Sequence, residues 1–292
     1  SLGQEAIGAV VGGLMRPVDV FLSTNREAGA QMARGVTMTE LLRYWSGDER
    51  GSDYQGPRQD FPVCITIAAH CAHAVGAAYA FKLRKQPRVA VAMMGDGATS
   101  KGDFYEAINM SGVWHLPVVF VVANNQWAIS VPRTIQSAGE TLAQKAIAAG
   151  IPGEQVDGND VIAVHHVFRQ ALEKARAGGG PCLIEALTYR LTDHTTADDA
   201  RRYRDPEEVS RQWAFEPIAR LRNYLVAQKA WGYGDEENLI AECNERVQAA
   251  VNEYLATPPP TPEAMFDHLY ATLPASLAWQ REAAAAEESR HG

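Results

Sequence analysis

The sequence predicts an α/β protein with a doubly wound, mostly parallel sheet flanked by helices and followed by a C-terminal helical extension. Residues 88–94 and 118–122 are two almost unbroken apolar runs, and a helical segment, 101–113, lies between them. Strands that are apolar throughout are typical of a parallel sheet covered on both faces. A third unit follows, with a helix over 161–177, a Gly-Gly-Gly-Pro turn and a strand over 182–189. Strand, helix and strand in this order form right-handed βαβ units.

The other elements follow in chain order. Residues 1–45 predict a helix, a short strand over 20–22, a turn and a second helix, and the Gly- and Asp-rich stretch 46–60 predicts a loop. An Ala-rich helix is expected over 76–85 and a polar loop over 191–206. Helical stretches at 207–228 and 235–256 end before Pro258, and a frayed or exposed tail follows from Glu282. We expect an α/β domain over 1–205 and a dependent helical extension over 206–292.

Composition limits the class of protein. The chain has 292 residues and a net charge of −8, which argues against binding to a nucleic-acid backbone. No run of 18 apolar residues predicts a membrane span. The cysteines form no CxxC pair, so we expect free thiols and a cytoplasmic location; they are Cys64, Cys71, Cys182 and Cys243. Ser1 replaces an initiator Met inside an apparent helix, so we expect the natural chain to begin earlier.

Polar residues follow the first two buried strands. Gly95-Asp96-Gly97 ends the first strand, and Asn124-Asn125 ends the second, with Asp96 and Asn125 separated by 29 positions. In a doubly wound sheet, ligands bind beyond the carboxyl ends of the strands. Carboxylate and amide oxygens suit Mg²⁺, glycines let the backbone approach an anion, and a helix beginning near Ser100 would direct its amides there. Each motif alone is usually a turn, but together they predict a metal-bridged diphosphate.

These residues resemble the thiamin diphosphate fingerprint, which begins with GDG and closes with NN about thirty residues later. Further segments are similar to the α subunits of thiamin-diphosphate-dependent 2-oxo acid dehydrogenases, the family of the pyruvate and branched-chain enzymes. These segments include Gly3-Gln4-Glu5-Ala6, residues 102–107, 150–153, 156–160 and 184–186, and the polar residues from Tyr189 to Arg204. The resemblance runs from Gly3 to about Leu273 and implies the thiamin diphosphate-binding fold.

The resemblance also implies roles for individual residues. Mg²⁺ is held by Asp96, Asn125 and the backbone carbonyl of Trp127, and His194 contacts a phosphate and the reacting centre. The other residues implied to bind the cofactor are Arg26, Ile65, Ile67, Gly95, Gly97, Ala98 and Arg190. Arg190 either anchors the polar loop or pairs with phosphate. Where the family carries Tyr before this Arg, the chain has Asn25, which alters one phosphate contact. His70 either lines the substrate pocket or is packed in the core.

Family members of this type need a second chain. The resemblance implies a β subunit that supplies the glutamate on the pyrimidine side, an α2β2 heterotetramer, and transfer of the acyl group to the lipoyl domain of an acyltransferase. A single chain of 292 residues has room for the diphosphate domain alone, so we expect no decarboxylation without the partner. The pattern looks more like bacterial pyruvate dehydrogenases than the branched-chain type, which remains the alternative, and we expect pyruvate as substrate.

Three other classes of protein are alternatives to a dehydrogenase α subunit. A split transketolase or decarboxylase chain would lack the loop with His194 and Asp198-Asp199. A non-catalytic paralogue that keeps the fold is opposed by the intact Asp96, Asn125 and His194, although Asn25 departs from the pattern. A different nucleotide-binding protein is opposed by the absence of G-x-G-x-x-G and G-x-x-x-x-G-K-[ST] motifs in the sequence.

Overall fold

The computed structural model describes residues 2–291, and the side chains of residues 2–287. Five parallel strands form one sheet in the order β1-β2-β3-β7-β6. Their bounds are β1 Val20–Leu22, β2 Ala90–Gly95, β3 Val118–Asn124, β6 Gly153–Asp157 and β7 Cys182–Leu187. The predicted α/β class with a parallel sheet flanked by helices is therefore confirmed. A two-stranded antiparallel hairpin, β4 Trp127–Ala128 and β5 Val131–Pro132, follows β3.

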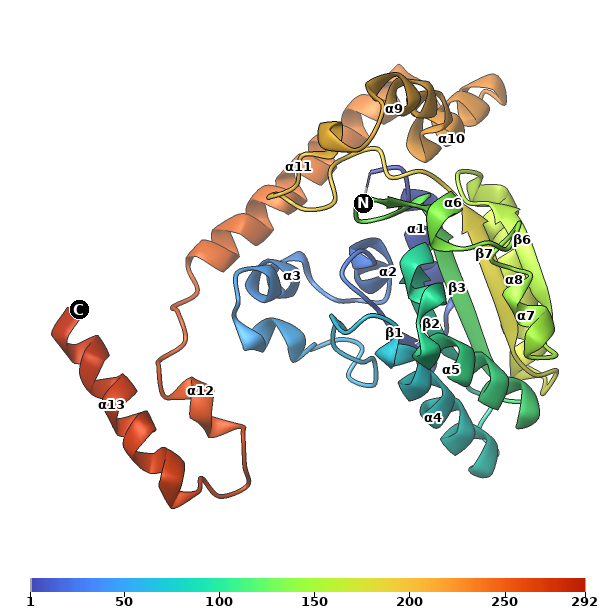
Figure 1. Ribbon diagram of the computed structural model, residues 1–292. Coiled ribbons are helices and arrows are strands. Elements are labelled where there is room, and N and C mark those ends of the chain that lie inside the picture. Colours follow the sequence, from blue (N-terminus) through green and yellow to red (C-terminus); the bar gives the residue numbers. More distant parts are fainter. Residues whose placement is uncertain (1, 292) are drawn as a thin grey trace.

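Helices cover both faces of the sheet (Figure 1). One apolar core packs the sheet against α4 Ala69–Leu83 and α5 Gly102–Val113, with α7 Lys145–Ala148 at its edge. A second core packs the other face against α1 Glu5–Leu14, α2 Ala28–Ala33 and α8 Val161–Arg176. Strand residues alternate between the two cores, so the central strands are buried on both faces. Their continuous apolar runs are the consequence of this burial.

The remaining helices lie around this body. They are α3 Met38–Trp45, α6 Arg133–Gln136, α9 Pro206–Gln212, α10 Pro217–Ala227, α11 Tyr233–Leu255, α12 Ala264–Asp267 and α13 Ala275–His291. Short 3₁₀ turns occupy 49–52, 96–100, 200–202 and 213–215. In Figure 1, α11 extends away from the sheet, and α12 and α13 lie beyond it. No helix of the described part of the chain is both long and apolar enough to cross a bilayer.

Several predicted boundaries were wrong. The Ala-rich helix begins at Ala69 rather than residue 76, because Ala68 adopts a positive φ of 68° just before it. The expected helix over 207–228 is two helices, since Glu216 precedes Pro217 and takes an extended ψ of 125°. The strand expected to reach residue 189 ends at Leu187. The tail from Glu282, expected to be frayed or exposed, is the end of the helix α13, and none of its described side chains is buried.

Candidate active site

A cavity of about 450 Å³ lies at the carboxyl ends of β2 and β3. Its lining includes every residue expected to bind the cofactor except Arg190: Arg26, Ile65, Ile67, Gly95, Asp96, Gly97, Ala98, Asn125, Trp127 and His194. Asn25 also lines it. Residues from five separate segments of the sequence therefore meet in one place. This is the edge at which a doubly wound sheet binds its ligands.

Asp96 and Asn125 meet because β2 and β3 are neighbours in parallel register, with Gly95 opposite Ala123. The Asp96 side chain is buried, and its Oδ2 has no hydrogen-bond partner. Burial raises the pKa of this carboxyl to about 6, against the opposing charges of Arg190, Arg133 and Arg26. A buried carboxylate oxygen without a partner is costly unless a cation or donor completes it.

The two other oxygens expected to bind the metal, Asn125 Oδ1 and the Trp127 carbonyl, each accept a hydrogen bond within the chain. Asn125 Oδ1 accepts a hydrogen bond from the Trp127 amide at 3.2 Å, and its Nδ2 donates to Gln4 Oε1 at 3.2 Å. The Trp127 carbonyl already accepts from Arg190 Nη1 at 3.2 Å. The described residues contain no group of three or more His, Cys, Asp or Glu arranged to hold a metal. A cation here would need a mixed set of one carboxylate, one amide oxygen, one carbonyl and ligand oxygens, which suits Mg²⁺.

Residues 96–100 form a 3₁₀ turn between β2 and α5, and the helix begins at Gly102, close to the expected start near Ser100. Thr99 Oγ1 donates to the Asp96 carbonyl at 2.8 Å and holds this turn. A Cβ built on Gly95 would meet no atom within 4 Å, whereas one on Gly97 would lie 2.9 Å from the Ala128 side chain. Gly97 is therefore needed for the close approach of the turn to the β4–β5 hairpin.

His194 is in hydrogen-bond contact with two arginines, Arg26 and Arg190. Its Nδ1 lies 2.7 Å from Arg26 Nη2 and 3.2 Å from Arg190 Nη1, and its carbonyl also accepts from Arg26 at 2.7 Å. Because guanidinium groups only donate, Nδ1 must accept, which assigns the proton to Nε2. Burial, with the charges of Arg26 and Arg190, lowers the pKa of His194 to about 4. The imidazole is neutral near pH 7 and presents an N–H donor.

Arg190 anchors the polar loop from behind the cavity. Its side chain is buried and donates to the Ile129 carbonyl at 2.7 Å and to Tyr203 Oη at 2.9 Å. Asp198 accepts from the His194 amide at 2.8 Å and from the Tyr203 hydroxyl. Of the two roles expected for Arg190, these contacts favour the anchor. They also fix the backbone of His194.

His70 is packed in the core and does not line the cavity. Its Nε2 donates to the Met93 carbonyl at 3.0 Å, three residues before Asp96. Burial lowers its pKa to about 4. Of the two interpretations left open by the sequence, the position favours the packed histidine.

Several lining residues had no role in the sequence interpretation. They are Gln4, Thr24, Glu27, Lys101, Ala123, Ala128 and Ile129. The Glu27 carboxylate accepts from the Thr24 amide at 2.6 Å and from its hydroxyl at 2.7 Å, which ties the turn that carries Arg26. Gln4 was matched only as part of a motif. Its interaction with Asn125 depends on contact across 121 positions, which no local pattern reveals.

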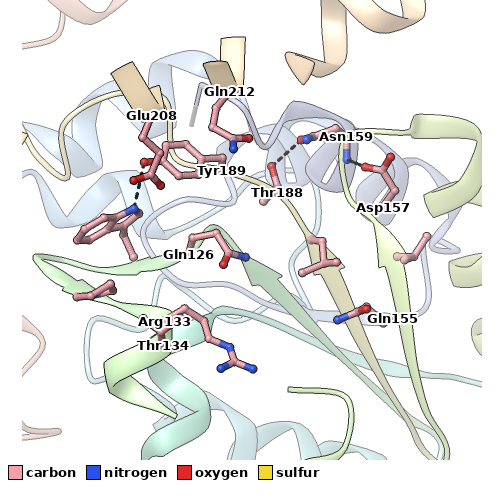
Figure 2. Close-up of a pocket in the computed structure, with 14 residues that line it drawn as sticks. Gln126, Arg133, Thr134, Gln155, Asp157, Asn159, Thr188, Tyr189, Glu208 and Gln212 are labelled. Carbon is pink, nitrogen blue, oxygen red and sulfur yellow. Dashed lines mark hydrogen bonds between the residues drawn. The ribbon is translucent and has the colours of Figure 1, made fainter. Parts of the chain in front are cut away.

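A second hollow of about 810 Å³ is also bordered by Trp127, and Figure 2 shows residues that line it. Figure 2 shows several carboxamides around it, among them Gln126, Gln155 and Asn159. Thr188 Oγ1 lies 2.7 Å from the side-chain amide of Asn159, and Trp127 Nε1 donates to Tyr189 Oη at 3.2 Å. Among the predicted site residues only Trp127 borders this hollow. The smaller cavity is therefore the candidate active site, because it gathers the oxygens and cations.

Comparison with known proteins gives consistent matches over nearly the whole chain. Residues 1–263 match the family model described as dehydrogenase E1 component. The chain is 38% identical over 284 residues to the pyruvate dehydrogenase E1 component subunit alpha of Mycoplasma genitalium, covering 97% of this chain and 79% of that protein. It is 41% identical over 288 residues to the 3-methyl-2-oxobutanoate dehydrogenase subunit alpha of Mycobacterium tuberculosis, covering 99% and 78%. The corresponding pyruvate dehydrogenase subunit of Staphylococcus aureus is 37% identical over 289 residues, covering 99% and 78%.

Proposed function

This chain belongs to the dehydrogenase E1 component family, and on that basis we propose that it is the α subunit of a 2-oxo acid dehydrogenase. Its reaction is the oxidative decarboxylation of a 2-oxo acid, with reductive transfer of the acyl group to a lipoyl group. The observation that carries the proposal is the cavity in which Asp96 and Asn125 face Arg26 and His194.

The cavity fits thiamin diphosphate with Mg²⁺. The unpartnered Oδ2 of Asp96 and the amide oxygen of Asn125 would hold the cation, with the Trp127 carbonyl as third protein ligand. The open space at Gly95 and the backbone at Gly97 and Ala98 leave room for the diphosphate. When bound, thiamin diphosphate supplies the nucleophilic carbon and the electron sink for decarboxylation.

The chain's own residues would position the bound cofactor and supply a proton donor. Arg26 places a guanidinium in the cavity, where it would pair with a phosphate oxygen while it also holds His194. His194 would donate its Nε2 proton to an oxygen at the phosphate or at the reacting centre, since both arginines keep Nδ1 as an acceptor. Its lowered pKa favours a neutral hydrogen-bond donor over a permanent cation. Ile65 and Ile67 would present backbone groups to the aminopyrimidine ring.

A β subunit would complete the site. The carboxylates that line the cavity are Asp96 and Glu27, and the Glu27 carboxylate is occupied by the Thr24 hydroxyl and by backbone amides. No carboxylate of the lining is therefore free for the pyrimidine ring, which needs one, and we assign that glutamate to the partner. Ile65 and Ile67 are 63% and 48% exposed, as expected for residues at a subunit contact. We further propose an α2β2 assembly that receives the lipoyl domain of the acyltransferase, in the cytoplasm.

We propose pyruvate as the preferred substrate, with 3-methyl-2-oxobutanoate as the alternative. Relatives with either name match this chain at similar identity. Three isoleucines border the cavity, Ile65, Ile67 and Ile129, and we propose that these bulky side chains favour a small acyl group. One methylene changes such selectivity by about 1–3 kcal/mol. Values of kcat/KM for the two acids on the assembled enzyme decide the question, and a clear preference for the branched acid would reverse it.

The proposal is tested by calorimetric titration of thiamin diphosphate with Mg²⁺, on the chain alone and on the chain with its β subunit. We expect tight binding only with both subunits and its loss in Asp96→Ala. Asp53→Ala, which removes an exposed loop carboxylate, is the matched control and should bind thiamin diphosphate as wild type does. Tight binding to the lone chain would contradict the shared site. Absence of binding in both samples would mean that the chain is a non-catalytic paralogue.

A further inference from the structure

Two buried polar atoms that face the candidate active site have no hydrogen-bond partner, and they are of opposite kind. One is Asp96 Oδ2, an acceptor, and the other is Gln4 Nε2, a donor. Gln4 is 5% exposed and lines the same cavity. Its other end is engaged, because Gln4 Oε1 accepts from Asn125 Nδ2 at 3.2 Å. A buried amide donor without an acceptor is unfavourable, so its retention beside a ligand cavity needs an explanation.

The chain holds Gln4 at this place by specific contacts of the residue before it. Gly3 has φ of 92°, and a Cβ there would lie 2.3 Å from the Tyr189 carbonyl. Thr188 Oγ1 donates to the Gly3 carbonyl, and the Gly3 amide donates to Glu5 Oε2 at 2.9 Å. The start of α1 is thereby fixed to the segment that follows β7. The Gln4 side chain is delivered to Asn125 by this anchorage.

We infer that Gln4 is a further binding residue of this site, and the inference rests on the proposed function. Its Nε2 donates to an anionic oxygen of the bound diphosphate, and its Oε1 fixes the amide of Asn125. The N–H donor of Gln4 cannot bind a cation. The carboxylate oxygen of Asp96 is repelled by a phosphate, because both are negative. The pair Asp96 Oδ2 and Gln4 Nε2 is therefore satisfied together by a cation with an anionic ligand, and by neither alone.

The orientation of Asn125 follows from the same contact. Because Gln4 Oε1 accepts from Nδ2, the amide of Asn125 cannot rotate to present its nitrogen to the cation without losing this bond. Oδ1 then keeps a lone pair beside its bond to the Trp127 amide. Gln4 therefore acts twice, once directly on the anion and once as a positioning residue for a metal ligand.

The test compares Gln4→Met and Gln4→Glu in the complex with the β subunit. Methionine has similar volume but no amide, and glutamate keeps an acceptor but loses the donor and adds a negative charge. The titrants are thiamin diphosphate with Mg²⁺, thiamin without phosphate, and Mn²⁺ alone as a spectroscopic probe of the cation site. We expect both variants to weaken thiamin diphosphate at least about 10-fold, the size of one lost hydrogen bond to a charged group. Thiamin should bind as in wild type.

Binding of Mn²⁺ alone distinguishes a direct contact between Gln4 and the diphosphate from a merely structural role of Gln4. Gln4→Glu should bind Mn²⁺ alone at least as well as wild type, because the added carboxylate attracts a cation, while its diphosphate binding falls. Gln170→Glu, an exposed change on α8, is the matched control for charge. Equal losses for thiamin and thiamin diphosphate, or unchanged diphosphate binding in Gln4→Met, would overturn the inference. If the wild-type complex bound no thiamin diphosphate, the proposed function itself would fail.

Discussion

Two histidines of this chain are kept neutral by burial, and they serve different purposes. His194 accepts at Nδ1 from Arg26 and Arg190 and lines the cavity. His70 donates to the carbonyl of Met93 inside the core, within the strand β2 that ends at Gly95, directly before Asp96. From the sequence, each was a histidine near a motif. Their surroundings alone distinguish a residue of the site from a residue that supports a strand.

His70 should make the protein less stable in mild acid. Its pKa is about 4 in the folded chain and 6.5 ordinarily, so between these values the unfolded chain binds more protons. Stability therefore falls as pH falls through this window, by about 2 kcal/mol between pH 7.5 and 5. His70→Gln keeps a donor for the Met93 carbonyl but does not titrate. Between the two pH values the variant should therefore lose about 2 kcal/mol less free energy of unfolding than wild type, as measured by urea unfolding. His165→Gln, a change at an exposed histidine, is the control. If the unfolding free energy of His70→Gln changed with pH as in wild type, His70 would not be the source of the pH dependence.

Asn25 lines the cavity beside Arg26, at a position where the resemblance in sequence leads us to expect a tyrosine. If the family's tyrosine hydroxyl contacts the diphosphate, Asn25→Tyr should tighten thiamin diphosphate about tenfold, the value of one hydrogen bond to a charged group. Calorimetry on the assembled enzyme measures the change. Asn25→Phe supplies the ring without the hydroxyl. Equal gains in both variants would assign the effect to packing of the ring instead.

At the scale of elements, the sequence predicts what has a strong pattern. β2 and β3 are almost continuous apolar runs, and β7 is apolar apart from Glu185. The order of the first two predicts that Asp96 lies beside Asn125. β6 has no such pattern, because Val156 is its single buried residue. The hairpin β4–β5 has two residues in each strand, too few for any periodicity. The contact of Gln4 could not be predicted for another reason, since it depends on Gly3 meeting Tyr189, which is far away in the sequence.

The anchorage of α1 gives a prediction at this scale. Gly3→Ala must adopt φ of 92° and place its Cβ 2.3 Å from the Tyr189 carbonyl, so it should destabilise the chain by about 3 kcal/mol. Gly13→Ala is the matched control within α1, since its Cβ meets nothing within 4 Å, and it should stabilise by about 0.5–1 kcal/mol. Urea unfolding of both variants measures the difference. Equal effects would mean that the start of α1 rearranges freely.

At the scale of the whole molecule, few polar contacts join the C-terminal extension to the α/β body. Arg220 of α10 pairs with Asp157 and Asp160, and Glu253 of α11 accepts from Thr39 at 2.7 Å. The helix α11 buries a single residue, Ala250. We propose that residues 206–292 depend on the body for their fold, as a surface this exposed supplies no core of its own. Their exposed apolar side chains indicate a surface that an assembly covers.

A second exposed apolar surface lies on α4 and α5, and it gives a test of assembly. We name it the α4–α5 patch, and its members are Tyr79, Leu83, Met110, Val113 and Trp114. The rings of Tyr79 and Trp114 pack together with centroids 5.0 Å apart. An exposed apolar patch on a helix layer is typical of a protein interface and gains stability when a partner covers it. We assign it to subunit contact within the proposed α2β2 enzyme.

Val113→Glu tests this assignment, because Val113 is 71% exposed and a charge there costs the lone chain little. In an apolar interface the same unpaired carboxylate would be desolvated, which is strongly unfavourable. We expect the variant to keep its circular dichroism and unfolding midpoint while sedimentation shows loss of the complex with the β subunit. Ile162→Glu, on α8 across the sheet, should assemble normally. Assembly of Val113→Glu at wild-type affinity would place the subunit contact elsewhere and leave the α4–α5 patch exposed in the enzyme.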